Sequence, residues 1–137
     1  MLRKYTLLLL LAVYACTSCN SSRRTIAIEE GWEMLGDMKV DFARDKDALQ
    51  INSSTRYTAI KFKVEKREIK IRDLKIVFAN MDKLEPSIEE TIPADQYSKE
   101  INLGYEGKEI RSIEFKYRTT GSIFKGRGNV LVFGKRY

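Results

Sequence analysis

From residue 57 onward, apolar and charged residues alternate with a period of two, which is typical of β-strands that bury one face and expose the other. In the clearest run, Ile60, Phe62 and Val64 alternate with Lys61 and Lys63. Similar runs cover residues 69–78, 101–103, 113–118 and 130–133. Glycines and charged turns separate these runs, so the pattern predicts a sandwich or barrel of antiparallel strands.

In the run 69–78 the apolar residues change from odd-numbered to even-numbered positions. Its apolar positions are odd-numbered up to Ile71 and even-numbered from Leu74 onward. A straight strand would therefore turn its second half toward the wrong face. We expect either a bulge or bend near Arg72 and Asp73, or a strand that crosses there from one sheet to another.

The stretch 29–50 is ambiguous, because Trp32, Leu35 and Met38 have the spacing of a helix. Two glycines in the same stretch would weaken a helix by about 1 kcal/mol each. We therefore predict strands here, with a turn at residues 45–47. Trp32 is expected in the core, beside Leu35.

The first 19 residues carry a different pattern. Arg3 and Lys4 precede the apolar run Leu7–Val13, and small residues and two cysteines follow it. A basic start, a short apolar centre and a small residue before the cut are the three parts of a secretion signal. The apolar run is shorter than the stretch of about 20 residues that a permanent membrane helix needs, so we expect it to be removed.

The residues Val13-Tyr14-Ala15-Cys16 resemble the lipid-attachment site of bacterial lipoprotein signals: an aliphatic residue, a variable residue, a small residue and a cysteine. The second cysteine, Cys19, fits less well because Cys16 takes its aliphatic position. We favour Cys16 and keep Cys19 as the alternative. The resemblance implies a diacylglycerol on the cysteine sulfur and several acyl chains in the membrane, which together anchor firmly. An ordinary secretory signal is the competing interpretation.

These patterns divide the chain into a signal peptide with its lipid-attachment region at 1–18, a tether at 19–30 and a β-sandwich domain at 31–137. Acidic residues often follow the cysteine in bacterial lipoproteins exported to the cell surface. The segment 21–24, Ser-Ser-Arg-Arg, contains none. We therefore expect a protein of the cell envelope that is lipid-anchored to a membrane and faces the periplasm.

A second resemblance covers residues 31–137. Its motifs are Trp32-Glu33-Met34-Leu35-Gly36, Val40-Asp41, Asp45-Lys46-Asp47, Ile101-Asn102-Leu103-Gly104 and Ile110-Arg111-Ser112-Ile113-Glu114-Phe115-Lys116-Tyr117-Arg118. They resemble those of a family of small secreted bacterial proteins of unknown function. The resemblance implies a single compact antiparallel β-sandwich, for which we expect about seven to nine strands. It implies no activity and no binding residues.

The amino-acid composition limits the kinds of active site and metal site that the domain can contain. The chain has no histidine, which excludes Ser-His-Asp and Cys-His nucleophile systems and zinc sites of the usual kind. No cysteine follows Cys19, so a domain of roughly 120 residues must be stable through packing alone. Asp41, Asp45 and Asp47 lack the glycine and the closing glutamate of the best-known calcium loop, and we interpret them as a solvated turn. We expect no metal and no cofactor.

The candidate ligand surface consists of Tyr97 and Tyr105, which lie near predicted loops, and of Lys61 and Lys63. The two lysines begin a basic run at 61–75, and a hairpin would collect several of its charges on one wet face. Such a face could meet anionic lipid headgroups or an acidic polysaccharide. Nucleic acid is not expected, because the interleaved aromatic pattern of single-strand binders is missing.

The sequence therefore favours a membrane-anchored envelope lipoprotein whose domain is a non-catalytic binding or structural module, with an envelope protein or a glycan as possible partner. The alternative is a carboxylate-based glycan hydrolase or a carbohydrate-binding module. A hydrolase needs two carboxyl groups with unlike environments in one concave site. A binding module can use a flat surface.

Overall fold

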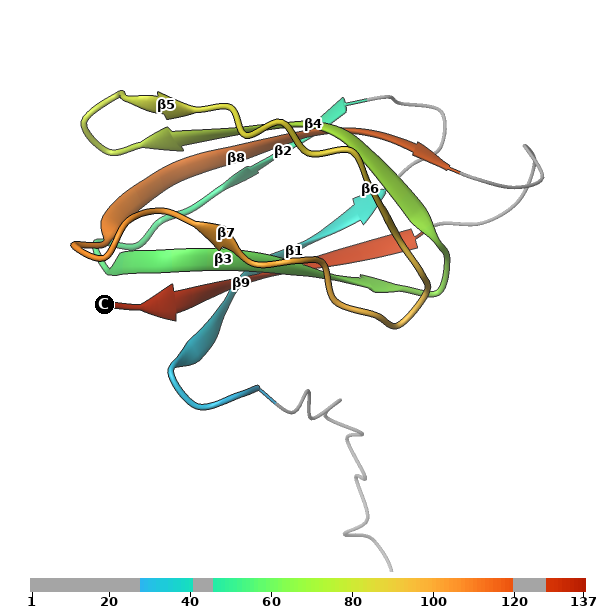
Figure 1. Ribbon diagram of the computed structural model, residues 1–137, viewed down its shortest axis with the longest axis horizontal. Coiled ribbons are helices and arrows are strands. Elements are labelled where there is room, and N and C mark those ends of the chain that lie inside the picture. The colour runs from blue at the N-terminus through green and yellow to red at the C-terminus, as the bar shows by residue number, and fades with distance from the viewer. Residues whose placement is uncertain (1–27, 41–45, 120–127) are drawn as a thin grey trace, which may run out of the picture.

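The computed structural model describes residues 28–40, 46–119 and 128–137, and these ranges contain nine antiparallel strands and no helix (Figure 1). The strands are β1 (Trp32–Val40), β2 (Lys46–Gln50), β3 (Arg56–Glu65), β4 (Ile69–Phe78), β5 (Lys83–Leu84), β6 (Glu90–Ile92), β7 (Ile101–Asn102), β8 (Lys108–Thr119) and β9 (Gly128–Arg136). The prediction of an all-β antiparallel fold is confirmed, and the number of strands lies in the expected range.

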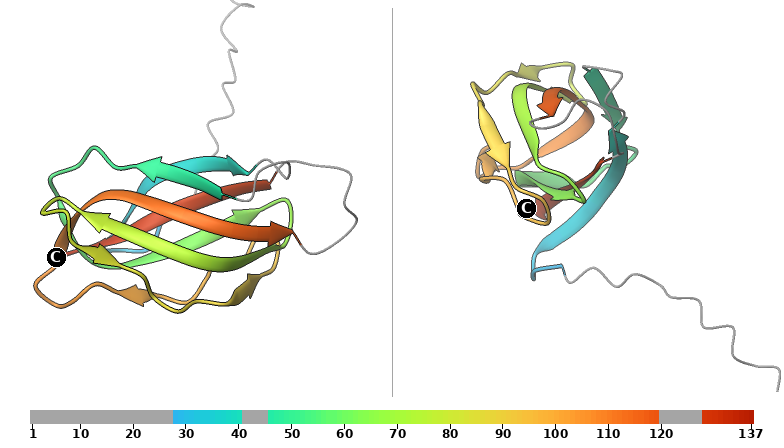
Figure 2. Two further views of the ribbon diagram at one scale, coloured as in Figure 1. Left: turned by 90° about the horizontal axis from the view of Figure 1, so that it is seen from above. Right: turned by 90° about the vertical axis from the view of Figure 1, so that its right-hand side faces the viewer.

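The nine strands form one sheet with the order β1-β9-β3-β8-β4-β5, while β2 pairs with β8, β6 with β4 and β7 with β3. The sheet folds over at the junction of β3 and β8, which pair only at Arg56 and Tyr57 of β3. Two layers therefore face each other: β1, β9 and β3 form the first, and β2, β8 and β4 form the second (Figure 1). Figure 2 shows how the strands enclose one interior.

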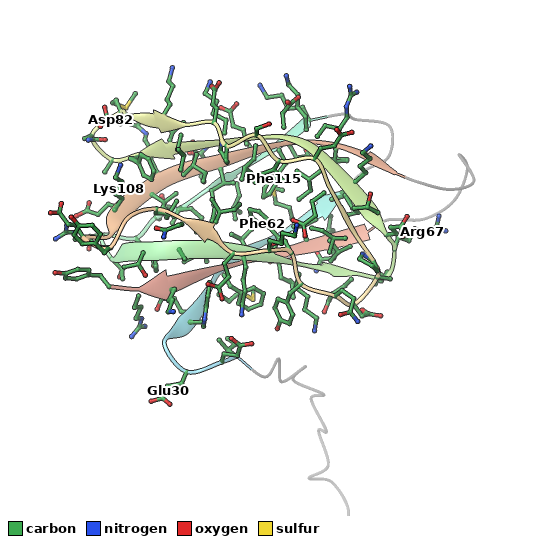
Figure 3. The ribbon with its side chains drawn as sticks, in the orientation of Figure 1. Glu30, Phe62, Arg67, Asp82, Lys108 and Phe115 are labelled. Atoms are coloured by element: carbon green, nitrogen blue, oxygen red, sulfur yellow. The ribbon has the colours of Figure 1, made fainter. Side chains whose placement is uncertain are left out.

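The core lies between the two layers, with Phe62 of β3 and Phe115 of β8 inside it (Figure 3). Their ring centroids are 5.0 Å apart, the ring planes meet at 75°, and the two residues are 1 % and 2 % exposed. An edge-to-face pair of this kind adds stability beyond the area it buries. The alternation seen in the sequence thus assigns the inward faces of both strands correctly.

The predicted irregularity in β4 is confirmed as a bulge. Ile71 pairs with Tyr117 of β8, and the next paired residue, Asp73, meets Lys116, so the register shifts between them. Arg72 is the extra residue, and Leu74 returns to the core. Both halves of β4 pair with β8, which decides against the alternative that the strand crosses between sheets.

The prediction of strands within 29–50 is confirmed, but the predicted turn at 45–47 is wrong at Lys46 and Asp47, which begin β2; residue 45 lies outside the described residues. The reason is pairing with β8. Lys46 Nζ lies 3.3 Å from the Glu114 carboxylate, and the Asp47 carboxylate accepts a hydrogen bond from the Tyr117 hydroxyl. Local sequence contains no sign of these distant partners.

The hairpin expected from the basic run 61–75 is also wrong. β3 pairs with β7, β8 and β9, whereas β4 pairs with β5, β6 and β8, so the two strands join different layers. Lys66 turns the chain between them with a φ of 74°. Lys61 and Lys63 are therefore separated from Lys70 and Lys75, which belong to the second layer.

The core pair gives a direct test of the fold. Phe62→Ala or Phe115→Ala should lower the free energy of unfolding by about 3–5 kcal/mol, because either change leaves a cavity between the layers. Chemical denaturation measures this. Tyr105→Ala is the matched control, since that ring is 87 % exposed. Equal stability of the core variants and the control would contradict the packing described.

Candidate functional site

The candidate site lies on the outer face of the first layer, where Lys61 is buried among aromatic side chains. Lys61 is only 6 % exposed, although its side chain points away from the main core. Its Nζ lies 4.2 Å from the ring centroid of Trp32, 4.8 Å from that of Tyr97 and 2.9 Å from Oε2 of Glu29. We call these four residues the Lys61 cluster.

A tight turn before β1 brings Glu29 to Lys61. The N–H of Trp32 donates to the carbonyl of Glu29 at 3.0 Å, and Gly31 within the turn has a φ of 81°. Glycine adopts this left-handed conformation without strain, and other residues rarely do. The N–H of Arg136 in β9 donates to the Gly31 carbonyl at 2.9 Å, which fixes the turn to the sheet.

Tyr97 comes from the segment between β6 and β7, which runs along the edge of β3. The Ser98 N–H donates to the Phe62 carbonyl at 2.7 Å, and the Ser98 hydroxyl accepts the Phe62 N–H at 2.9 Å. Tyr97 forms an antiparallel bridge with Lys63. Its ring packs on Phe133 of β9 with centroids 5.8 Å apart. Tyr97 thus closes the side of the cluster opposite Trp32.

A small apolar cluster, separate from the main core, lies on the same outer face. It consists of Trp32, Ala59, Leu131 and Phe133, all buried. Leu131 pairs with Lys63 and Phe133 pairs with Lys61, so the lysine stems run across this apolar surface. The sequence does contain a signal for it: residues 130–133 are apolar without interruption, which fits a strand covered on both faces.

Two expectations need correction here. Lys61 was expected on a wet face, yet it is buried, because Trp32 and Tyr97 cover it from segments distant in sequence. Trp32 is buried as expected but does not pack beside Leu35. Residues three apart in a strand point to opposite faces, so Trp32 joins the outer cluster while Leu35 packs against the main core.

The structure brings three of the predicted ligand residues together and leaves one apart. Lys63 is half-buried beside the cluster, with Nζ 5.5 Å from the Tyr97 ring centroid. Tyr105 lies instead in the turn after β7, where the Gly107 N–H donates to the Gly104 carbonyl. Cys16 and Cys19 lie outside the described residues. Sequence reasoning missed Glu29 and Trp32 as members of the site.

The Lys61 cluster suits binding and positioning rather than bond-making. Each ring face near an ammonium group contributes up to about 2 kcal/mol when water is excluded. Glu29 adds a charge-assisted hydrogen bond, although its side chain is 67 % exposed. These interactions offset the cost of burying Lys61, and they fix the turn before β1 and the segment containing Tyr97 on one face.

A second polar contact holds the start of β1 to the end of β9. The Glu33 carboxylate accepts hydrogen bonds from the buried Tyr57 hydroxyl and from Arg136, whose Nε is 2.6 Å away. Gly134 makes room for Tyr57, because a Cβ there would lie 2.6 Å from the ring. The hydrogen bond from Tyr57 lowers the pKa of Glu33. Burial acts in the opposite direction, and Arg136 lowers this pKa further. Burial and the Glu33 bond raise the pKa of Tyr57.

The outer face of the second layer is different in character. It has a hollow of about 360 Å³ whose lining includes three carboxylates, each within 4.0 Å of a lysine. The pairs are Lys46–Glu114 at 3.3 Å, Lys75–Glu85 at 4.0 Å and Lys116–Asp73 at 3.7 Å. A glycan hydrolase needs two carboxyl groups with unlike environments, whereas these three carboxylates each lie beside a lysine.

The described residues contain no group of three or more acidic, cysteine or histidine side chains placed to hold a metal ion. They also contain no helix of the length and hydropathy required to cross a bilayer.

The comparison with protein families places the chain in one of them. A family model described as a domain of unknown function (DUF2541) matches residues 6–134, and the chain belongs to this family. No curated protein and no solved structure matches the chain. The expectation of a family without an assigned function is thereby confirmed, and the function must be argued from the residues.

The Glu33 contact predicts a specific pH dependence. Because its pKa in the folded state lies below the ordinary value near 4.5, the contact stabilises the fold above that pH and is lost as the pH falls through the folded-state value. Glu33→Gln should cost about 1 kcal/mol of unfolding free energy at pH 7, and the difference should shrink below pH 4.5. Urea denaturation across pH measures it, with the exposed Glu106→Gln as control. A pH-independent difference would contradict this assignment.

Proposed function

We propose that this protein is a lipid-anchored protein of the cell envelope, facing the periplasm, whose β-domain is a non-catalytic binding module held at the membrane surface. The observation that carries the proposal is the sequence before the domain: the apolar run Leu7–Val13 leads directly into Val13-Tyr14-Ala15-Cys16. This pattern fits removal of the leader and lipid attachment to the cysteine.

The spacing between the cysteines and the domain supports a close tether. Among the described residues, Glu29 is the first that bonds to the outer face, and it follows Cys16 by 13 residues and Cys19 by 10. An extended chain covers at most about 3.5 Å per residue, so the reach is about 45 Å from Cys16 or about 35 Å from Cys19. A short tether raises the effective concentration of the domain at its membrane to the millimolar range.

The character of the described site supports binding rather than catalysis. The Lys61 cluster directs its ammonium group toward two ring faces and a carboxylate of the same chain. The hollow on the second layer pairs its three carboxylates with lysines. These arrangements fit a module that presents surfaces, and they give less support to the alternative of a carboxylate-based glycan hydrolase.

A carbohydrate-binding module is the second candidate, and one observation favours it. Tyr105 and Tyr137 are 87 % and 72 % exposed. A hollow of about 380 Å³ is lined by residues that include Arg56, Asn80 and Glu106; the Arg56 guanidinium carbon lies 5.0 Å from the Tyr137 ring centroid, and Tyr105 directly precedes Glu106. Exposed aromatic rings beside polar groups are the usual means of holding a sugar ring. This end of the domain would then bind a glycan, while the lipid anchor holds the domain at the membrane.

The anchor is tested by removing the thiols. The double variant Cys16→Ser with Cys19→Ser should move the protein from the membrane fraction to the soluble fraction of the producing cells, because the apolar run is too short to replace the acyl chains. Fractionation followed by immunoblotting measures it.

The single variants are the matched controls and identify the attachment site. Cys16→Ser alone should release the protein and Cys19→Ser alone should not, if Cys16 carries the lipid. Retention of the double variant in the membrane fraction would refute the anchor.

A further inference from the structure

The exposed apolar side chains of the described residues form two groups. Ile28, Met34 and Tyr97 are 43 %, 39 % and 38 % exposed. Tyr97 belongs to the Lys61 cluster, Met34 pairs with Phe133 on the same outer face, and Ile28 directly precedes Glu29. The other group, Met81, Tyr105 and Tyr137, belongs to the end of the domain that carries the C-terminus (Figure 1).

Two lysines lie beside aromatic rings of the same outer face. Lys135 Nζ lies 6.0 Å from the Trp32 ring centroid and Lys63 Nζ lies 5.5 Å from that of Tyr97. Neither lysine forms a salt bridge with a carboxylate of the described residues. Aromatic rings combined with lysines that extend from an apolar surface are typical of the boundary between lipid and water.

The acidic groups on this face are few and partly engaged. Glu29 pairs with Lys61, and Glu65 on the outer side of β3 is buried and accepts a hydrogen bond from Asn129. Asp37, which pairs with Leu131 of β9, is the exposed carboxylate on the outer side of β1, and Glu30 is exposed in the turn before it. The outer face of the second layer, in contrast, carries a series of salt bridges and none of the exposed large apolar side chains. Of the two outer faces, the first therefore has the chemistry that a bilayer surface accommodates.

The chain enters the domain at this same face. Glu29 bonds Lys61, and Glu30 lies beyond the first layer, on the side away from the second (Figure 3). The Glu29–Lys61 contact and the turn at Gly31 hold the entry point there. A tether that arrives from a membrane consequently brings the Lys61 cluster toward that membrane first.

We infer that the outer face of β1, β9 and β3 docks on a phospholipid surface containing anionic headgroups, with Tyr97, Met34 and Ile28 at the headgroup level and Lys63 and Lys135 on the phosphates. The inference rests on the proposed function, because the lipid anchor supplies the proximity. At the millimolar effective concentration of a short tether, millimolar affinity of the face suffices for the docked state to be populated. The second layer and the Tyr105 end then face away from the membrane.

The test uses the full lipidated protein in vesicles, and its probe is already present because Trp32 is the sole tryptophan. The vesicles consist of phosphatidylcholine with or without phosphatidylglycerol, and some headgroups carry a nitroxide spin label, which quenches tryptophan fluorescence through space at short range and therefore reports on Trp32 although its ring is buried. We expect at least twofold stronger quenching of Trp32 in the vesicles that contain phosphatidylglycerol.

A charge reversal and a matched control locate the contact. Lys63→Glu with Lys135→Glu should reduce the quenching to the level of pure phosphatidylcholine vesicles. Lys83→Glu with Lys108→Glu changes the net charge equally but lies on β5 and at the start of β8, and should leave quenching unchanged. Thermal melting verifies that each variant is folded.

Flotation of the same vesicles separates the two proposals. Protein that does not float with either vesicle type contradicts the lipid anchor itself. Protein that floats but shows equal quenching in both vesicle types, or equal loss in both double variants, overturns the docking of this face and leaves the anchor standing. Such a result would direct the search for a partner to a protein or glycan.

Discussion

The structure depends on covering a strand that is apolar on both sides. β9 buries Val130 and Val132 in the main core, and Leu131 and Phe133 on the outer face of the first layer. A sheet folded over once covers only its inner face, so the apolar residues on the outer face must be covered by other side chains. Lys61 covers them, since it lies between Trp32 and Tyr97 and is bonded to Glu29. The same contacts fix where the chain enters the domain.

This covering of the outer face connects stability with the proposed role. An apolar outer face covered only by rings and lysine stems remains partly exposed at Met34 and Tyr97, and such a surface suits a lipid boundary better than bulk water. If the domain hangs from a lipid by a short tether, the partly covered face is the one nearest the bilayer. The salt bridges of the second layer suit the opposite, solvated direction. The packing of β1, β9 and β3 thus accounts both for the covering of β9 and for the orientation that we propose for the domain at the membrane.

Much of the fold could be predicted from local sequence, because alternation and parity are local properties. The inward faces of β3 and β8 and the bulge at Arg72 follow from the spacing of apolar residues. The strand nature of β1 follows instead from two glycines that disfavour a helix, although the apolar spacing there is helical. The partners of each strand could not be predicted in this way. β3 and β4 adjoin in sequence yet belong to different layers, and Lys46 enters a strand because it pairs with β8.

The candidate site could also be predicted only in part. Tyr97, Lys61 and Lys63 were recognisable by residue type, but their contacts with Trp32 and Glu29 join segments that are distant in sequence. Family membership adds no function to these residues.

The position of Lys61 between two aromatic rings is the central claim, and proton NMR of its ε-methylene group tests it most directly. Protons above the faces of aromatic rings resonate upfield of their usual position. The account predicts that the Lys61 ε-methylene signal lies clearly upfield of that of the exposed Lys83, and that Trp32→Leu or Tyr97→Leu moves it back toward the Lys83 position. A Lys61 signal at the position of Lys83, unchanged in both variants, would contradict the account.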